Sequence, residues 1–189
     1  MTTNNKIELM APAGNFESLQ AALDNGCDSV YFGVEQLNMR ARASVNFTMD
    51  DLAEIAKRCE AKNVRSYLTL NTIIYDHDLS VVKTLINKAK EANITAVIAS
   101  DQAVIAMARS VGMEVHISTQ LNVTNIETIK FYSLFADTMV LSRELSLRQV
   151  KKITEQIEKE QIKGPNGNLV EIEIFGHGAL CMAVSGKCY

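Results

Sequence analysis

Residues 7–26 read Ile-Glu-Leu-Met-Ala-Pro-Ala-Gly-Asn-Phe-Glu-Ser-Leu-Gln-Ala-Ala-Leu-Asp-Asn-Gly and show the unit that this chain repeats. The apolar run 7–11 predicts a strand, and the Pro12-Ala-Gly14 turn ends it. Asn15 is a typical N-cap residue, and the helix that follows it, predicted over 16–25, ends at Gly26. The stretch therefore predicts one strand followed by one helix.

The same alternation recurs along the chain. We expect strands at 7–11, 29–34, 64–74, 96–100, 114–119, 138–142 and 169–175, with helices at 16–25, 49–61, 79–92, 102–110, 125–135 and 147–160. Seven strands that alternate with six helices predict parallel strands joined by right-handed crossovers. The strands are apolar nearly throughout, as expected of strands that are covered on both faces.

Two architectures fit this pattern, an open doubly wound sheet and most of a (β/α)8 barrel. No Gly-x-Gly-x-x-Gly follows the first strand, which disfavours a dinucleotide-binding sheet. A complete barrel usually needs about 250 residues, and this chain has 189. We therefore expect an α/β fold, a parallel (β/α) barrel-like arrangement that is an incomplete TIM-type barrel of seven strands. Residues 1–189 would form a single domain, the N-terminal part of a longer protein, whose open strand edges favour a homodimer.

Composition narrows the class of protein. With 47% hydrophobic residues the chain can bury a sizeable core, and its net charge of -3 gives no overall basic surface for tight non-specific nucleic-acid binding. The N-terminus lacks the pattern of a signal peptide and no apolar run could span a bilayer, so we expect a cytoplasmic protein without membrane contact. Its cysteines should then be thiols or metal ligands, with Cys27 and Cys59 on core positions.

Polar residues gather where the predicted strands end. In a barrel the site lies at the carboxyl ends of the strands, although loops are polar in any case. Histidine and glutamate side chains could activate a water or a nucleophile at these ends. His116 lies in the middle of a predicted strand instead, and we expect it to be structural. The long connection after the second strand could clamp a phosphate or carboxylate with its arginines, or be a solvated basic loop. The candidate catalytic residues are His177, Glu173 and Glu144, and the candidate substrate-binding residues are Arg40, Arg42, Asn71, Gln120 and Arg143.

The last turns of the chain carry two cysteines among small residues. Cys181 and Cys188 are separated by six residues and follow a predicted strand. Thiolates select zinc, copper(I) or iron–sulfur clusters over hard cations. Two cysteines supply half of a usual four-ligand set, so the predicted metal site is incomplete in this chain.

Residues 172–189, Ile-Glu-Ile-Phe-Gly-His-Gly-Ala-Leu-Cys-Met-Ala-Val-Ser-Gly-Lys-Cys-Tyr, closely resemble the signature of peptidase family U32, the collagenase-like proteins. The likeness extends through the stretches 8–14, 30–33, 69–72, 118–120 and 140–147. It implies a barrel-like N-terminal domain. Family members include proteins labelled peptidases and proteins of oxygen-independent hydroxylation, acting on a tRNA uridine, a 23S rRNA cytidine or the ubiquinone ring.

For the hydroxylating branches the resemblance implies a 4Fe-4S cluster held by four cysteines, with prephenate as the hydroxyl source. Cys181 and Cys188 match the first two ligands, and the other two would lie beyond Tyr189. Three hypotheses follow: an iron–sulfur enzyme that hydroxylates tRNA or rRNA, a peptidase acting on protein, or a non-catalytic scaffold that binds a partner. The absence of a Ser/His/Asp signature favours the first, and the RNA-hydroxylating members look most similar.

Overall fold

The computed structural model describes residues 7–34, 47–178 and 181–187. In these residues seven parallel strands form one sheet, in which each strand pairs with the strands before and after it in sequence. The strands are β1 Met10–Pro12, β2 Ser29–Gly33, β3 Arg65–Leu70, β4 Ala96–Ala99, β5 Glu114–Ile117, β6 Thr138–Val140 and β7 Glu171–Glu173.

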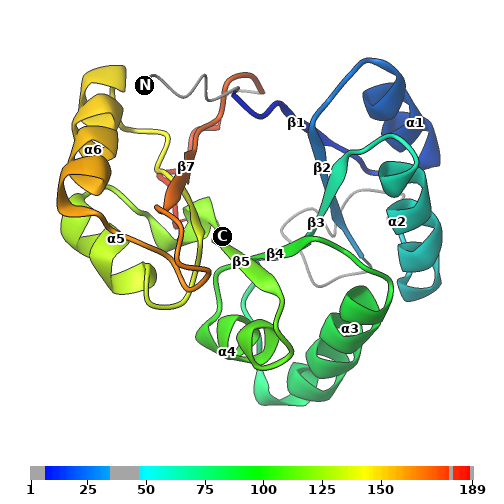
Figure 1. Ribbon diagram of the computed structural model, residues 1–189. Coiled ribbons are helices and arrows are strands. Elements are labelled where there is room, and N and C mark those ends of the chain that lie inside the picture. Colours follow the sequence, from blue (N-terminus) through cyan, green and yellow to red (C-terminus); the bar gives the residue numbers. More distant parts are fainter. Residues whose placement is uncertain (1–6, 35–46, 179–180, 188–189) are drawn as a thin grey trace.

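Helices surround this curved sheet and leave β1 and β7 facing each other across its open side, so the fold is a half-barrel (Figure 1). The predicted parallel, barrel-like fold is confirmed. The α-helices are α1 Phe16–Asp24, α2 Leu52–Glu60, α3 Leu79–Glu91, α4 Gln102–Ser110, α5 Ile126–Tyr132 and α6 Leu147–Glu160, with short 3-10 turns η1 Met49–Asp51, η2 Asp76–Asp78 and η3 Thr119–Leu121.

The first unit forms as its sequence predicts. Asn15 caps α1: its Oδ1 accepts a hydrogen bond from Ser18 N at 2.8 Å, and Ser18 Oγ accepts one from Asn15 N at 3.1 Å. This reciprocal pair satisfies two backbone donors that a helix start leaves open. Gly26 follows the helix with φ of +79°, a conformation that glycine adopts without steric cost.

Several predicted elements are too long. The third strand ends at Leu70 rather than at residue 74, because the chain turns into an exposed loop in which the Ile73 side chain faces solvent. The helix expected over 49–61 divides into η1 and α2. Asp51 Oδ2 accepts hydrogen bonds from both Thr48 N and Thr48 Oγ1 there, which fixes a tighter first turn.

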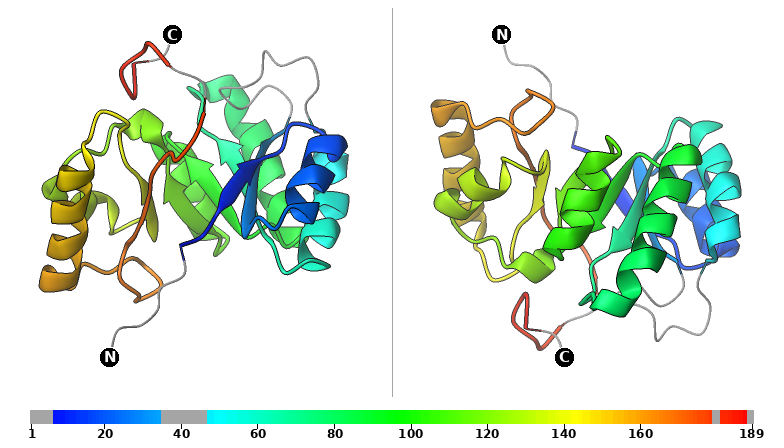
Figure 2. Two further views of the ribbon diagram at one scale, coloured as in Figure 1. Left: turned by 90° about the horizontal axis from the view of Figure 1, so that it is seen from above. Right: turned by 90° about the horizontal axis from the view of Figure 1, so that it is seen from below.

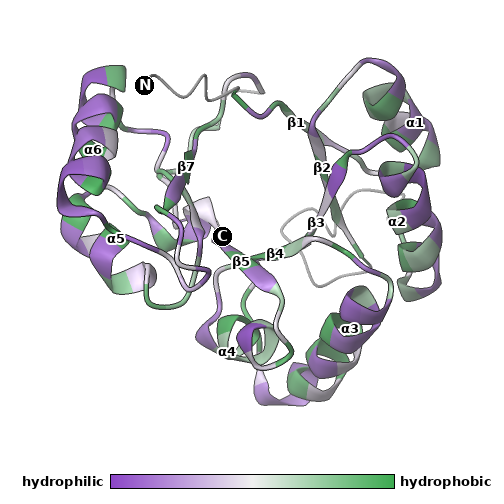
Figure 3. Ribbon diagram, in the orientation of Figure 1, coloured by the Kyte–Doolittle hydropathy of each residue, from purple (hydrophilic) through white to green (hydrophobic). Residues whose placement is uncertain are grey.

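Two apolar layers hold the half-barrel together. The larger one lies between the sheet and the helices, and it includes Cys27 and Cys59, which are buried as predicted. The smaller one, around Tyr67 and Ile98, lines the lumen, by which we mean the concave face of the sheet. Hydrophilic positions on β5 and β7 interrupt this face (Figure 3). In the described ranges, no helix combines the length and apolar character that a membrane crossing requires.

Candidate functional site

The carboxyl ends of the strands form a rim, and a segment from the end of the chain is docked on it. This segment, residues 181–187, is called the cysteine segment here because it carries Cys181. Figure 2 shows it on the side toward which the strands point. Its location agrees with the expectation that the site of a parallel barrel lies at this end.

Ser185 is the centre of the docking contacts and is 1% exposed. Its N–H donates a hydrogen bond of 2.8 Å to Glu144 Oε1, and its Oγ accepts one of 3.3 Å from Arg143 N. The Arg143 guanidinium donates from Nη2 to the Ala183 carbonyl at 3.0 Å. The backbone hydrogen bond from Ser185 also lowers the pKa of Glu144. Arg143 and Glu144 therefore bind the cysteine segment.

Gly186 allows the closest approach of this segment to the rim. Its φ is +76°, and a Cβ at this position would lie 2.5 Å from the Gln120 carbonyl oxygen. A side chain there would collide with backbone rather than with a movable group. The predicted substrate-binding residue Gln120 thus supplies, through its backbone, part of the surface on which the segment rests.

The metal-binding prediction involves residues inside and outside the described ranges. Cys181 is exposed, and its Sγ lies 3.9 Å from the Ala183 carbonyl oxygen. Within 7–34, 47–178 and 181–187, no three histidine, cysteine or acidic side chains come together as a metal site. Cys188, Arg40 and Arg42 lie outside the described residues, so their predicted roles stay predictions.

The remaining rim residues take separate positions. Asn71, after β3, donates from Nδ2 to Ser118 Oγ at 3.4 Å, which links the ends of β3 and β5. His177 is exposed. Among the described contacts, neither Glu173 nor Glu144 hydrogen-bonds or ion-pairs with His177, so the structure does not bring the predicted histidine–carboxylate pair together.

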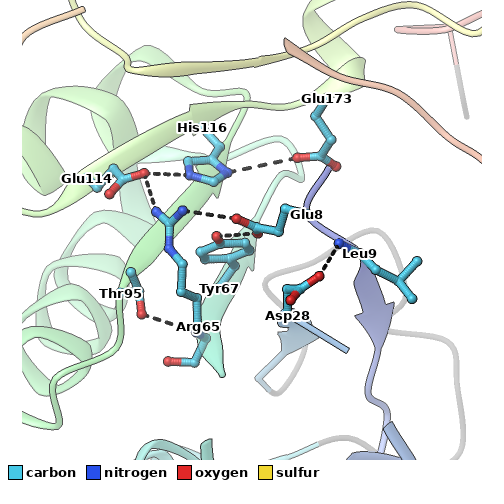
Figure 4. A network of polar contacts seen from close by, with 10 residues as sticks. Glu8, Leu9, Asp28, Arg65, Tyr67, Thr95, Glu114, His116 and Glu173 are labelled. Carbon is cyan, nitrogen blue, oxygen red and sulfur yellow. Dashed lines mark hydrogen bonds and ion pairs between the residues drawn. The ribbon is translucent and has the colours of Figure 1, made fainter. Parts of the chain in front are cut away.

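Glu173 instead points into the lumen, where sequence reasoning expected no site (Figure 4). Its Oε2 lies 3.9 Å from Nδ1 of His116, and His116 Nε2 lies 2.9 Å from Glu114 Oε1. Arg65 then bridges Glu114 and Glu8, with N···O distances of 2.9 and 3.1 Å. One polar network thus joins β3, β5 and β7 to Glu8, which precedes β1.

Tyr67 completes this lumen network. Its hydroxyl donates to Glu8 Oε1 at 2.7 Å, and its ring lies 4.6 Å from that of His116. Burial raises the pKa of Tyr67 far above its usual range, and burial also raises the pKa of Glu173, to about 6. Burial acts in the same direction on Glu114, but hydrogen bonding to His116 and the charge of Arg65 outweigh it and lower the Glu114 pKa.

A period-2 pattern could have revealed the lumen network from the sequence. On β3, Arg65 and Tyr67 alternate with residues that face the helices. Glu114 and His116 do the same on β5. Residues two apart in a strand share a face. Because the strands were expected to be apolar nearly throughout, no role was predicted for Glu8, Arg65, Tyr67 or Glu114.

The family model described as peptidase family U32 matches residues 14–189. The chain belongs to this family. It is 56% identical over 185 residues to a collagenase of Porphyromonas gingivalis, covering 98% of this chain and 45% of the relative. It is 32% identical to a tRNA hydroxylation protein of Bacillus subtilis, covering 97% and 41%.

The 23S rRNA 5-hydroxycytidine C2501 synthase of Escherichia coli is a third relative, 31% identical, with 99% of this chain and 27% of that protein covered. The chain thus spans less than half the length of these curated relatives. Among solved structures, a U32 peptidase matches 83% of this chain and 68% of its own with a TM-score of 0.66 and 14% identity. That likeness supports the half-barrel fold.

Proposed function

We propose that this U32 chain is part of an iron–sulfur-dependent enzyme that hydroxylates a base in tRNA or rRNA without oxygen. The observation that carries the proposal is the docked cysteine segment, which presents the exposed Cys181 thiol at the rim where a barrel has its site. The relatives named for tRNA and rRNA hydroxylation support it. A cytoplasmic location follows from an RNA substrate.

The chemistry of the donors fits a 4Fe-4S cluster in part. Cys181 is a solvent-reachable thiol next to a backbone carbonyl, and the proposal assigns it and Cys188 as two thiolate ligands. Two more ligands would have to come from outside this chain. When bound, the cluster would supply one-electron redox chemistry at the rim, while Arg143, Glu144 and Ser185 hold its ligand segment in place.

Prephenate, the hydroxyl source that the family resemblance implies, carries two carboxylates. Arginine binds carboxylates through paired N–H donors. We therefore propose Arg40 and Arg42 as the residues that would hold such an anion, together with Asn71 and Gln120. Their contribution can be measured separately from that of the cysteines.

Analysis of RNA nucleosides tests this function. The gene is disrupted in its host, and nucleosides from tRNA and 23S rRNA are measured by mass spectrometry. We expect a hydroxylated uridine or cytidine to disappear, and to return with the wild-type gene but not with Cys181→Ser. An unchanged set of hydroxylated nucleosides after disruption would contradict the proposal.

A collagenase-like peptidase is the second candidate, favoured by the 56% identity to a collagenase. In this case His177 would act with Glu173 or Glu144. Glu144 is engaged by Ser185 and Glu173 faces His116, which gives this pairing less support. Gelatin cleavage by the purified protein that is lost in His177→Ala would favour the peptidase. If the protein does not cleave gelatin and its disruption changes no nucleoside, a non-catalytic scaffold is favoured.

A further inference from the structure

The His116 imidazole and the Glu173 carboxyl group face each other in the lumen, between β5 and β7. His116 is 3% exposed, and its Nε2 lies 2.9 Å from Glu114 Oε1. A carboxylate accepts hydrogen bonds, so in a neutral imidazole the proton sits on Nε2 and Nδ1 is left as an acceptor. This Nδ1 is buried and has no hydrogen-bond partner among the residues that the structure describes. The carboxylate oxygen nearest to it, Glu173 Oε2, is 3.9 Å away and is an acceptor too.

The charges around this pair are also unbalanced. In the described part of the chain, three carboxylates, those of Glu8, Glu114 and Glu173, share the lumen network with one guanidinium, that of Arg65. Arg65 contacts Glu8 and Glu114, whereas no lysine or arginine within the described ranges pairs with Glu173, which has only the His116 ring beside it. A partly buried carboxylate without a cationic partner is costly. Burial raises the pKa of Glu173, and the nearby charge of Glu8 acts in the same direction.

We propose that the lumen binds an organic cation, a guanidinium or ammonium group, that donates N–H hydrogen bonds to His116 Nδ1 and to the Glu173 carboxylate. Such a group supplies both missing elements, donors between two acceptors and a positive charge among carboxylates. A direct bond between the two residues is excluded by their 3.9 Å separation, which exceeds hydrogen-bond range.

The location of the site indicates how a cation reaches it. Glu173 ends β7 and Glu8 precedes β1, and these two strands border the open side of the half-barrel. Exposed apolar side chains adjoin these two strands, Ile7 and Leu9 just before β1 and Ile174 and Phe175 just after β7. The cation can therefore belong to a free amine or to a basic side chain on an extended segment that pairs with an open edge.

Nitrogen-15 NMR of the histidine rings tests the site in the 189-residue protein. Methylguanidine is titrated as the probe, with tetramethylammonium, which has charge but no N–H donor, at equal ionic strength. We expect the His116 Nδ1 resonance to shift saturably with methylguanidine and not with tetramethylammonium. The exposed His177 ring provides an internal reference.

Two variants on one strand make the test specific. Glu173→Gln removes the proposed anionic acceptor and should weaken methylguanidine binding by about tenfold or more. Glu171→Gln removes an exposed carboxylate two residues earlier on the same face of β7 and should leave binding unchanged. If Glu173→Gln does not fold, Glu173→Asp replaces it, and weaker binding is again expected.

A second titration separates the two sources of the cation. The peptide acetyl-Val-Arg-Val-amide offers the same guanidinium on an extended backbone. If the peptide binds more tightly than methylguanidine, the source of the cation is a basic side chain on a paired segment. If the peptide binds equally or more weakly, the source is a free amine. Absence of a saturable His116 shift with both probes, or a shift that Glu173→Gln leaves unchanged, would overturn the proposal. This outcome is independent of the RNA nucleosides.

Discussion

Gly186 is the residue on which docking of the cysteine segment depends most directly. Gly186→Ala would place a methyl group 2.5 Å from the Gln120 carbonyl and would require residues 181–187 to move. We expect the Ser185 amide, which donates to Glu144, to exchange its hydrogen at least about tenfold faster, as loss of roughly 1.4 kcal/mol of local stability implies. Hydrogen exchange followed by NMR measures this.

Gly167 is the matched control for that substitution. Its φ of +81° resembles that of Gly186, but a Cβ there meets no atom within 4 Å. Gly167→Ala therefore carries the backbone strain, about 1 kcal/mol, without the collision. Equal acceleration of Ser185 exchange in both variants would show that strain rather than the contact with Gln120 explains the effect.

Glu173 links stability to pH at the residue scale. Burial raises its pKa in the folded state from 4.5 to about 6, so the folded state binds its proton more tightly than the unfolded state. The protein should consequently lose stability as pH rises from 4.5 through 6. Glu173→Gln should be the more stable protein at pH 7, by at most about 2 kcal/mol.

Urea unfolding of the wild type and Glu173→Gln across this pH range measures that difference. The two curves should converge below pH 4.5, where Glu173 is protonated in both states. A stability difference that is the same at low and neutral pH would mean that the substitution acts through packing and not through the charge.

At the scale of elements, the position of a cysteine decides whether it can bind a metal: Cys59 lies on α2 and Cys181 on the cysteine segment. Cys59 is 1% exposed on the buried face of this helix, and burial raises its pKa to about 11, so it is a poor thiolate ligand at neutral pH. Cys181 is exposed on the docked segment. In the full-length, anaerobically purified protein, Cys181→Ser should remove most bound iron.

The complementary variant is Cys59→Ser. It buries a hydroxyl and should cost about 1–3 kcal/mol of stability while leaving iron content unchanged. Iron and sulfide analysis together with thermal unfolding gives both quantities. Iron that is lost in Cys59→Ser and kept in Cys181→Ser would show that the ligand assignment is wrong.

Sequence patterns predicted helices well where neighbouring residues, such as a capping pair or a periodic apolar face, determine the structure. Asn15, with Ser18 three residues later, signals the start of α1, and the apolar positions of α2 predict its buried face. The patterns failed where tertiary contacts decide. The polar network of Arg65 and Glu114 depends on distant strands meeting in the lumen, and docking of Ser185 onto Glu144 joins residues 41 apart.

At the scale of the whole molecule, the alternation of strands and helices predicted that the strands are parallel. The chain length predicted that the barrel is incomplete. The rim was predicted as a site because parallel strands end on one side. The sequence did not predict which of the candidate residues bind the cysteine segment and which face the lumen. Arg143 and Glu144, expected to meet substrate, bind the cysteine segment, and Glu173 belongs to the lumen. These roles depend on side-chain directions that strand spacing does not specify.

The open side of the half-barrel predicts self-association. The described sheet runs from β1 to β7 without closing, and an unpaired strand edge presents backbone donors and acceptors to another chain. Leu9 and Ile174 expose apolar side chains beside these edges. We expect light scattering to show a dimer whose fraction rises with protein concentration.

Charge placed at the edge should prevent this association. Leu9→Lys is expected to shift the dissociation constant upward by about tenfold or more, because a lysine beside an edge opposes pairing with a second strand. Leu134→Lys is the matched control: Leu134 is 69% exposed, against 61% for Leu9, but it lies between α5 and β6, and β6 is not an edge strand. A dimer weakened equally by both would place the contact elsewhere, and a monomer at every concentration would show that these edges do not pair with a second copy of the chain.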